Sequence, residues 1–243
     1  MDRQQVSRIA HTRHPIAAPL SDQAVTDVLN RALEHRTQLL DLGCGSAEWL
    51  LRALELQPEA QAVGIDVSEP ALAHARTEAQ RRGMSDRLQI RAEDAAGLAP
   101  EARFDVVFVV GSSHAFGGLL PSLQAARRHL APGGVVVIGD GYWENPPSEQ
   151  ALEIIGPMDD LAGLVASVTE DGWTPVHGHT STRAELDAYE WAWTGTLAAW
   201  GLEQAGTPAG EQALAVAREH REGWLGGYRD SFGFVTLILS PAG

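Results

Sequence analysis

The sequence has no lysine, because all 18 of its basic residues are arginine. This absence excludes enzymes that work through a lysine Schiff base and proteins that need a phosphate-binding P-loop lysine. Cys44 is the only cysteine, so no disulfide can form within the chain. No apolar run approaches membrane-spanning length, and the first residues lack the apolar core of a secretion signal. We therefore expect no membrane association and a reducing, cytoplasmic location.

Basic charge is also scarce. The chain has 32 acidic residues against its 18 arginines, a formal charge of −14, and no basic run. Because proteins that bind nucleic acids cluster positive charge, we expect no DNA or RNA partner. The more plausible partner is a small molecule, neutral or cationic. A length of 243 residues fits one α/β domain with a modest insertion.

Short apolar runs alternate with helical patterns through the first part of the chain. The runs of strand length are QLLDL, AVGID, RLQIRA, FDVVFVV and GGVVVIGD, and helices are expected over 20–36, 47–56, 69–82 and 118–130. This alternation predicts a parallel, doubly wound sheet. After residue 140 we expect broken helices over 146–171, a strand WTPVHGHTST, helices over 183–204 and 211–229, and a closing strand FGFVTLIL.

The expected fold is therefore an α/β, Rossmann-like sheet of about seven strands, the last one antiparallel, with helices on both faces and a small helical cap. Four parts are expected along the chain. They are an irregular N-terminal arm or lid over 1–20, a Rossmann-like core over 21–182, a helical cap insertion over 183–230, and a final strand over 231–243 that returns to the core.

The stretch LLDLGCGSAEW places an acidic residue and two glycines where the first strand should end. Glycine lets the backbone of such a turn approach a ligand closely at the carboxyl edge of a parallel sheet. Asp66 ends the second strand and lies 21 positions beyond Gly45, which suits hydrogen bonding to ribose hydroxyls. The turn therefore predicts a nucleotide-binding edge.

The ordered set DLGCGSAEW, GIDVSEPALAHAR, RAEDA, FDVVFVV and LAPGGVVVIGD resembles the class I methyltransferases that use S-adenosylmethionine (SAM), over about residues 37–141. The resemblance implies that SAM is the cofactor. It implies that Asp41 and the two glycines face the methionine part of SAM, that Asp66 binds the ribose, and that Asp94 with Ala95 holds the adenine. The residues expected to bind the cofactor are Asp41, Gly43, Cys44, Gly45, Asp66, Val67, Glu93, Asp94, Ala95 and Val110.

Two other functions stay open. A nicotinamide-dependent oxidoreductase would use the same sheet edge, but the turn lacks the last glycine of the G-x-G-x-x-G fingerprint. Glu48 stands there, where a pyrophosphate would approach, and a carboxylate should repel it. SAM carries no phosphate, and its cationic groups suit an acidic crevice. The second alternative is a protein that binds SAM without catalysing a reaction.

His114, in GSSHAFGG after the fourth strand, is the candidate catalytic residue. An imidazole titrates near neutral pH, which suits a base that takes the proton of a hydroxyl or amine. A helix-capping or packing role is the alternative. The residues expected to contact the substrate are His14, Asp140, Tyr142, Trp143, Glu190 and Trp193. Aromatic rings with carboxylates would suit a cationic amine, although the same rings could simply pack the cap.

The helix expected over 183–204 is apolar on both sides, so it should be covered twice, either within the chain or in a homodimer. His177 and His179 share a face of the expected strand WTPVHGHTST. No nearby cysteine or acidic residues complete a metal-ligand pattern with them, so we expect no metal. The resulting hypothesis is an enzyme that transfers the SAM methyl group to a nitrogen or oxygen of a small molecule. Its pocket is expected between the sheet edge and an aromatic cap.

Overall fold

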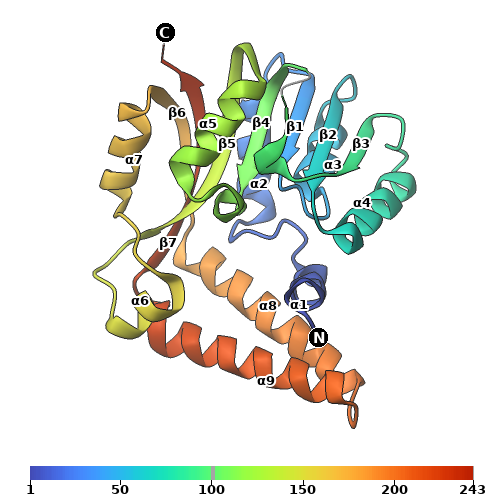
Figure 1. Cartoon of the computed structure of the whole chain (residues 1–243), viewed down its shortest axis with the longest axis vertical. Helices are drawn as coiled ribbons and strands as arrows, with labels where there is room; N and C mark the ends of the chain where they lie inside the picture. Colours follow the sequence, from blue (N-terminus) through green and yellow to red (C-terminus); the bar gives the residue numbers. More distant parts are fainter. Residues whose placement is uncertain (100–101, 243) are drawn as a thin grey trace. The chain divides into compact units, whose positions relative to one another are not determined.

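The computed structural model of the chain describes residues 1–99 and 102–242 (Figure 1). The chain divides into two compact units. The sheet unit consists of Ser21–Asp140, Val165–His179 and Val235–Gly243, and the helical unit consists of Met1–Leu20, Gly141–Leu164 and Thr180–Phe234. The arm, core, cap and final strand expected from the sequence stay a prediction. Position 243 of that final strand, and positions 100–101 of the expected core, lie outside the described residues.

The sheet formed by the described residues has seven strands in the order β3-β2-β1-β4-β5-β7-β6. The strands are β1 (Gln38–Leu42), β2 (Gln61–Asp66), β3 (Leu88–Ala92), β4 (Phe104–Val110), β5 (Leu130–Trp143), β6 (Trp173–Thr180) and β7 (Phe232–Pro241). The pairs β3–β2, β2–β1, β1–β4 and β4–β5 are parallel, and antiparallel pairing is confined to the last strands. The expected Rossmann-like fold class is confirmed.

The register of the parallel strands brings their carboxyl ends to one edge. Leu42 at the end of β1 lies opposite Ile65 of β2, and Asp66 lies opposite Ala92, the last residue of β3. The loops after these strands therefore start side by side, which is the arrangement that the sequence motifs require.

Helices of the sheet unit pack against these strands. They are α2 (Asp22–Ala32), α3 (Glu48–Leu56), α4 (Glu69–Arg81) and α5 (Leu119–His129), while α7 (Leu161–Glu170) lies across the division between the units. Helix α3 packs on β1, β2 and α2, and α5 packs on β4. Leu40 of β1 and Phe108 of β4 are 1% and 0% exposed. Truncating a fully buried phenylalanine such as Phe108 to alanine costs about 3–5 kcal/mol.

Arg127 of α5 contacts β6, the strand at one edge of the sheet. Its guanidinium lies 4.1 Å from the ring centroid of Trp173, the first residue of β6. The same guanidinium donates hydrogen bonds to the carbonyl oxygens of Asp171 and Gly172, at 3.1 and 2.9 Å. A planar cation that stacks and donates at once is a contact that lysine cannot reproduce.

The helical unit contains α1 (Arg3–Ala10), the 3₁₀ turn η1 (His11–Arg13), α6 (Glu149–Ile155), α8 (Arg183–Glu203), α9 (Pro208–Gly223) and the π-helical turn η4 (Trp224–Tyr228). Helix α8 begins with a capping box, in which the Thr182 side chain accepts from the Glu185 amide and the Glu185 side chain accepts from the Thr182 amide. Helices α1, α8 and α9 share a buried cluster of Ile9, Ala10, Leu197, Ala213 and Ala217. On the outer side of α8, Trp191 and Leu202 remain 52% and 66% exposed.

The backbone of the first residues is not irregular as expected, because α1 forms there. The Asp2 carboxylate caps the helix by accepting from the Gln5 amide at 2.8 Å. Ile9 and Ala10 then bury their side chains against α8 and α9. Tertiary packing of this kind stabilises a short helix whose own sequence is a poor predictor. The helix expected over 20–36 is shorter than predicted and ends at Ala32.

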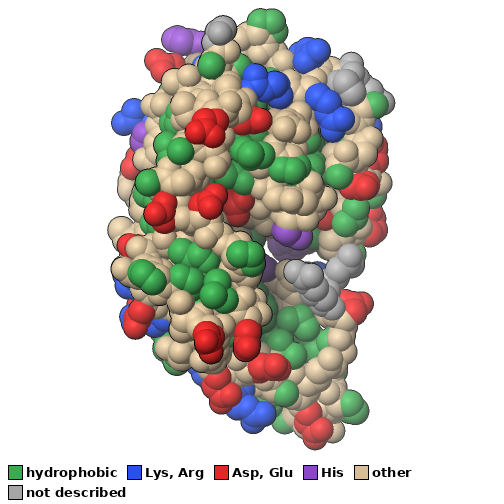
Figure 2. All heavy atoms as spheres, turned by 60° about the vertical axis from the view of Figure 1, so that its left-hand side comes forward, with side chains coloured by type: hydrophobic (Ala, Val, Ile, Leu, Met, Phe, Trp, Pro, Cys, Tyr) green, Lys and Arg blue, Asp and Glu red, His purple; other side chains and the backbone are tan. Residues whose placement is uncertain are grey.

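The surface is acidic overall, as the composition requires. Asp and Glu side chains are scattered over the face drawn in Figure 2, with arginine side chains among them. Within residues 1–99 and 102–242, none of the helices is long and apolar enough to cross a membrane.

Candidate functional site

The glycine turn after β1 is tightly packed against the loop that follows β4. Gly43 has φ +95°, and its amide donates to the carbonyl oxygen of Ile65 at 2.8 Å. A Cβ atom on Gly43 would lie 2.5 Å from the Cβ of Ser112, whose hydroxyl donates to the Leu42 carbonyl oxygen at 2.8 Å. Only glycine fits this position without displacing Ser112. The turn is thus held in place from both neighbouring strand ends.

Asp66 joins the end of β2 to the same turn. One carboxylate oxygen accepts from the Gly45 amide at 2.8 Å, and the other accepts from the Ser68 amide at 2.8 Å. Gly45 has φ +52°, and no atom lies within 4 Å of the Cβ that it lacks. The open space above Gly45 and the acidic group beside it form the concave, hydrogen-bonding edge that a nucleoside ligand needs.

Asp41 lies beneath the turn and is 3% exposed. Burial, and secondly the negative charge of Asp66, raise its pKa to about 8. Burial also raises the pKa of the Cys44 thiol well above its usual value, and the charges of Asp41 and Asp66 add to that shift. Cys44 is therefore a packing residue and not a reactive thiolate. A cationic ligand above the turn would favour ionisation of Asp41.

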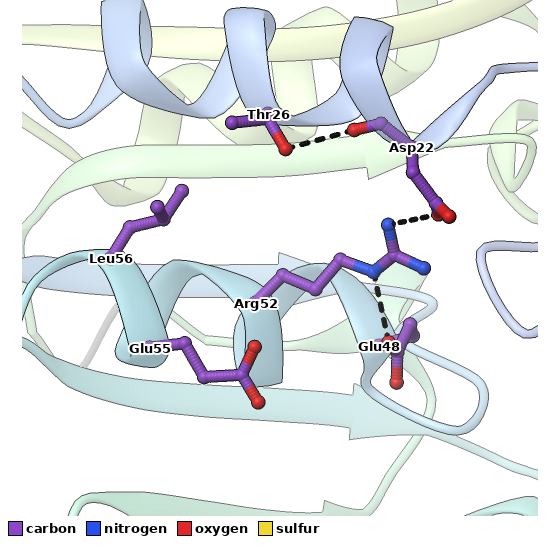
Figure 3. A pocket seen from close by; sticks show the side chains of 6 residues that line it. All are labelled: Asp22, Thr26, Glu48, Arg52, Glu55 and Leu56. Carbon is purple, nitrogen blue, oxygen red and sulfur yellow. Dashed lines mark hydrogen bonds and ion pairs between the residues drawn. The ribbon is translucent and has the colours of Figure 1, made fainter.

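Glu48, at the start of α3, is buried but paired with two arginines. Arg52 donates to it at 2.9 Å and Arg82 at 2.8 Å. Figure 3 shows Arg52 lying between Glu48 on α3 and Asp22 on α2, which it contacts at 2.6 Å. The expected repulsion of a pyrophosphate by Glu48 is therefore largely offset by these arginines. The argument against a dinucleotide rests instead on the missing third glycine, because a longer side chain occupies its place.

The groove beside Arg52 has a volume of about 300 Å³. Its lining residues are Asp22, Thr26, Glu48, Arg52, Glu55 and Leu56 (Figure 3). Arg52 lines the groove and donates to the carboxylates of Asp22 and Glu48, so the groove belongs to the packing of α2 against α3.

The loop after β3 carries the expected adenine-binding residues. Asp94 is exposed and its side chain accepts from the Ala96 amide at 3.0 Å, which starts the short 3₁₀ turn η2 (Ala95–Gly97). Glu93 forms an ion pair with Arg91 at 2.7 Å, and its amide donates to the carbonyl oxygen of Asp66 at 3.1 Å. Val67, beside Asp66, is 64% exposed. These positions all lie at the carboxyl ends of β2 and β3.

His114 lies in the 3₁₀ turn η3 (Ser113–Phe116) that follows β4, and its side chain is exposed. Turn η3 packs against η2, so His114 and Ala95 belong to adjoining loops of the sheet unit. Val110, at the end of β4, is half-buried. The structure thus groups the ten expected cofactor residues and His114 on one edge of one unit.

The substrate residues that the sequence analysis places after the fifth strand lie within the last part of β5, and two of them are more deeply buried than an open site requires. Tyr142 is 3% exposed, and its ring lies where a Cβ on Gly233 would be. Trp143 is 5% exposed and meets Phe232 edge to face at 6.4 Å. Burial raises the pKa of Tyr142. Asp140, the last residue of the sheet unit before these rings, is half-buried.

His14, Glu190 and Trp193 all belong to the helical unit. His14 donates from Nε2 to the Ala18 carbonyl oxygen at 2.8 Å and meets the ring of Tyr189 edge to face at 5.4 Å. Glu190, the next residue along α8, is 8% exposed.

Sequence reasoning missed the partners of Glu190, which are His220 and Tyr228. His220 Nε2 and the Tyr228 hydroxyl each lie 2.8 Å from a different Glu190 oxygen. Trp193 stacks on His220 with ring centroids 4.1 Å apart. Val216, His220 and Trp224 follow one another at a spacing of four, which puts His220 on an apolar stripe of α9, but no local pattern marks a partner 30 or 38 positions away. Within the described part of the chain, no group of three or more His, Cys, Asp or Glu could hold a metal ion.

Comparison with known proteins adds three findings. Residues 40–136 match a family described as a methyltransferase domain. The uncharacterized protein YjhP of Escherichia coli is 29% identical over 208 residues, which are 82% of this chain and 83% of that protein. The 27-O-demethylrifamycin SV methyltransferase of Amycolatopsis mediterranei is 34% identical over 135 residues, 55% of this chain and 49% of that enzyme, so the chain spans about half of its length.

Among solved structures, a methyltransferase from Geobacter sulfurreducens in complex with S-adenosylhomocysteine has the same fold. Its TM-score is 0.90 at 24% identity, and the match covers 98% of both chains.

Proposed function

We propose that this chain, whose residues 40–136 match a methyltransferase domain, is a class I SAM-dependent methyltransferase that transfers the methyl group of SAM to a nitrogen or oxygen of a small molecule. The observation that carries the proposal is the turn at Gly43 and Gly45, closed by hydrogen bonds to Ile65 and Asp66 at the carboxyl edge of the sheet. The relative named 27-O-demethylrifamycin SV methyltransferase supports a small-molecule acceptor.

The residues of this edge fit SAM. The carboxylate of Asp66 offers negative charge, and a cationic ligand would favour ionisation of Asp41 beside it. No lysine or arginine side chain is among the residues proposed to contact the cofactor, which suits a cationic ligand without phosphate. We assign Asp41, Gly43 and Gly45 to the methionine part, Asp66 to the ribose, and Asp94 with Ala95 to the adenine. The rest of the proposed set is Cys44, Val67, Glu93 and Val110.

When bound, SAM supplies a methyl group on a sulfonium sulfur: the acceptor atom forms a bond to the methyl carbon, the carbon–sulfur bond breaks, and its electron pair stays on sulfur to give S-adenosylhomocysteine. The chain's part is to hold the acceptor about 3 to 3.5 Å from that carbon, in line and away from water. We propose His114 as the residue that takes the acceptor's proton, because its turn η3 follows β4 and packs against η2, the turn that contains Ala95.

Asp140, Tyr142, Trp143, His14, Glu190 and Trp193 are our candidates for contacting the acceptor. Their rings and carboxylates support an aromatic or cationic molecule. A homodimer stays a prediction.

The test is calorimetric titration with SAM and S-adenosylhomocysteine, with NADH as the control. We expect micromolar binding of both sulfur nucleotides and none of NADH. Binding of NADH alone would point to an oxidoreductase. Affinity for SAM without transfer of labelled methyl to a broad panel of phenols and amines would point to a protein that binds SAM and catalyses nothing.

A further inference from the structure

Glu190 is a buried carboxylate at the meeting point of three elements of the helical unit. It extends from α8, and it accepts from His220 Nε2 of α9 and from the Tyr228 hydroxyl of η4, each at 2.8 Å. The Tyr228 hydroxyl also lies 3.3 Å from His220 Nε2. Each carboxylate oxygen of Glu190 thus accepts a hydrogen bond from a side chain of the protein itself.

A gain in stability from packing does not by itself explain why Glu190, His220 and Tyr228 are buried together. Burying a carboxylate is costly, and a buried ion pair is often no more stabilising than apolar side chains of the same size. The helix is also distorted at this point, because α9 widens into the π turn η4, whose last residue is Tyr228. Single π turns are rare and occur frequently at functional sites. The cluster therefore has the marks of a site and not of a simple core contact.

His220 is the reachable member of the cluster. Its side chain is 33% exposed, whereas that of Glu190 is 10% exposed. One ring face is covered by Trp193, stacked at an interplanar angle of 21°. With Nε2 directed at the carboxylate, Nδ1 is the nitrogen left to accept a proton, and none of the hydrogen bonds among the described residues uses it. A carboxylate that fixes one ring nitrogen sets the tautomer of the other.

The other titratable groups near Glu190 do not compete with His220 for a ligand's proton. Burial, and next the charge of Glu190, raise the pKa of both Tyr189 and Tyr228, so both hydroxyls stay protonated. His11 already accepts from the Tyr189 hydroxyl at 3.0 Å, because its Nδ1 donates to the Ser7 carbonyl oxygen. Burial, with the nearby histidines 14 and 220, lowers the pKa of His11.

We propose that the helical unit binds a phenolic hydroxyl, and that His220, oriented by Glu190 and Tyr228, takes its proton in place of His114. The O–H bond breaks, its electron pair stays on oxygen, and the proton forms a bond to His220 Nδ1. The resulting imidazolium lies against the Glu190 carboxylate and the face of Trp193, both of which favour a cation. This inference rests on the proposed function and names a phenol as the class of small molecule that the helical unit binds.

The probe is 4-nitrophenol, whose phenolate absorbs visible light. The holoprotein with S-adenosylhomocysteine is titrated with the probe at a pH where free 4-nitrophenol is mainly protonated. We expect a saturable rise in phenolate absorbance with the wild type, the same rise with the control His74→Gln, which changes an exposed histidine of α4, and loss of the rise with His220→Gln. Glu190→Gln should reduce it, because the imidazolium loses its carboxylate.

Three outcomes would overturn the inference: no saturable rise in the wild type, an undiminished rise in His220→Gln, or a rise lost in His114→Gln but kept in His220→Gln. S-adenosylhomocysteine binding is measured on each variant first. Failure of the wild type to bind it would refute the proposed function, whereas normal binding without the absorbance change would refute only the role of His220. If His220→Gln does not fold, ¹⁵N-histidine spectra of the wild type decide, since the probe should protonate Nδ1 of one histidine.

Discussion

Replacing Gly43 by alanine tests whether the turn is held as tightly as its geometry indicates. The new Cβ would lie 2.5 Å from the Cβ and 2.8 Å from the hydroxyl oxygen of Ser112. Overpacking of this kind costs about 1–3 kcal/mol, and a non-glycine residue at left-handed φ adds about 1–2 kcal/mol. We therefore expect Gly43→Ala to lower the free energy of unfolding by about 2–5 kcal/mol.

Gly45→Ala is the matched control, because its φ is also left-handed but no atom lies within 4 Å of the added carbon. It should cost only the backbone strain of about 1–2 kcal/mol. Denaturant unfolding gives both values, and Ser112→Gly in the Gly43→Ala background should recover part of the loss by removing the clashing carbon. Equal costs for the two alanine variants, or no recovery in the double variant, would refute the packing argument.

Three further predictions concern the sheet unit. The pKa of Asp41 is raised from 3.8 in the unfolded chain to about 8 in the folded chain. Its contribution to stability is therefore complete below the unfolded-state pKa and is lost as pH rises through about 8. Asp41→Asn should flatten this decline of unfolding free energy with pH in denaturant unfolding, and an unchanged decline would contradict the pKa shift. Asp66→Ala removes two charge-assisted hydrogen bonds of about 1.5–3 kcal/mol each, so S-adenosylhomocysteine affinity by calorimetry should fall at least about tenfold, and unchanged affinity would remove the ribose assignment. Arg127→Lys should lower the free energy of unfolding by about 1–3 kcal/mol, because the contacts with Trp173 and with two carbonyl oxygens are lost. The control Arg128→Lys changes an exposed side chain and should leave that free energy unchanged. Equal effects of the two variants in denaturant unfolding would refute the stacking role of Arg127.

The glycine turn and the strand ends could be predicted from the sequence because their signals are local. An apolar run, two glycines and an acid at the end of the next strand lie close along the chain, and parallel pairing then brings Gly45 and Asp66 together. Helix α1 could not be predicted in this way, since its stability comes from contacts of Ile9 and Ala10 with α8 and α9.

The side-chain clusters were out of reach for the same reason. Glu48 meets Arg82 from 34 positions away, and Glu190 meets Tyr228 from 38. The sequence identified both carboxylates as noteworthy and assigned them ligand-related roles. Only the folded chain shows that each is already occupied by protein donors.

The position of β7 between β5 and β6 has a consequence for synthesis on the ribosome. Strands β1 to β5 emerge first and can pair among themselves. Strand β6 lies at the edge of the sheet, and among the residues that the structure describes it pairs only with β7, which is made later. Until β7 is translated, both β5 and β6 present unpaired backbone edges, the kind of surface that promotes aggregation of nascent chains. A chain whose synthesis stops before Phe232 would therefore need a chaperone, although its glycine turn has already been made.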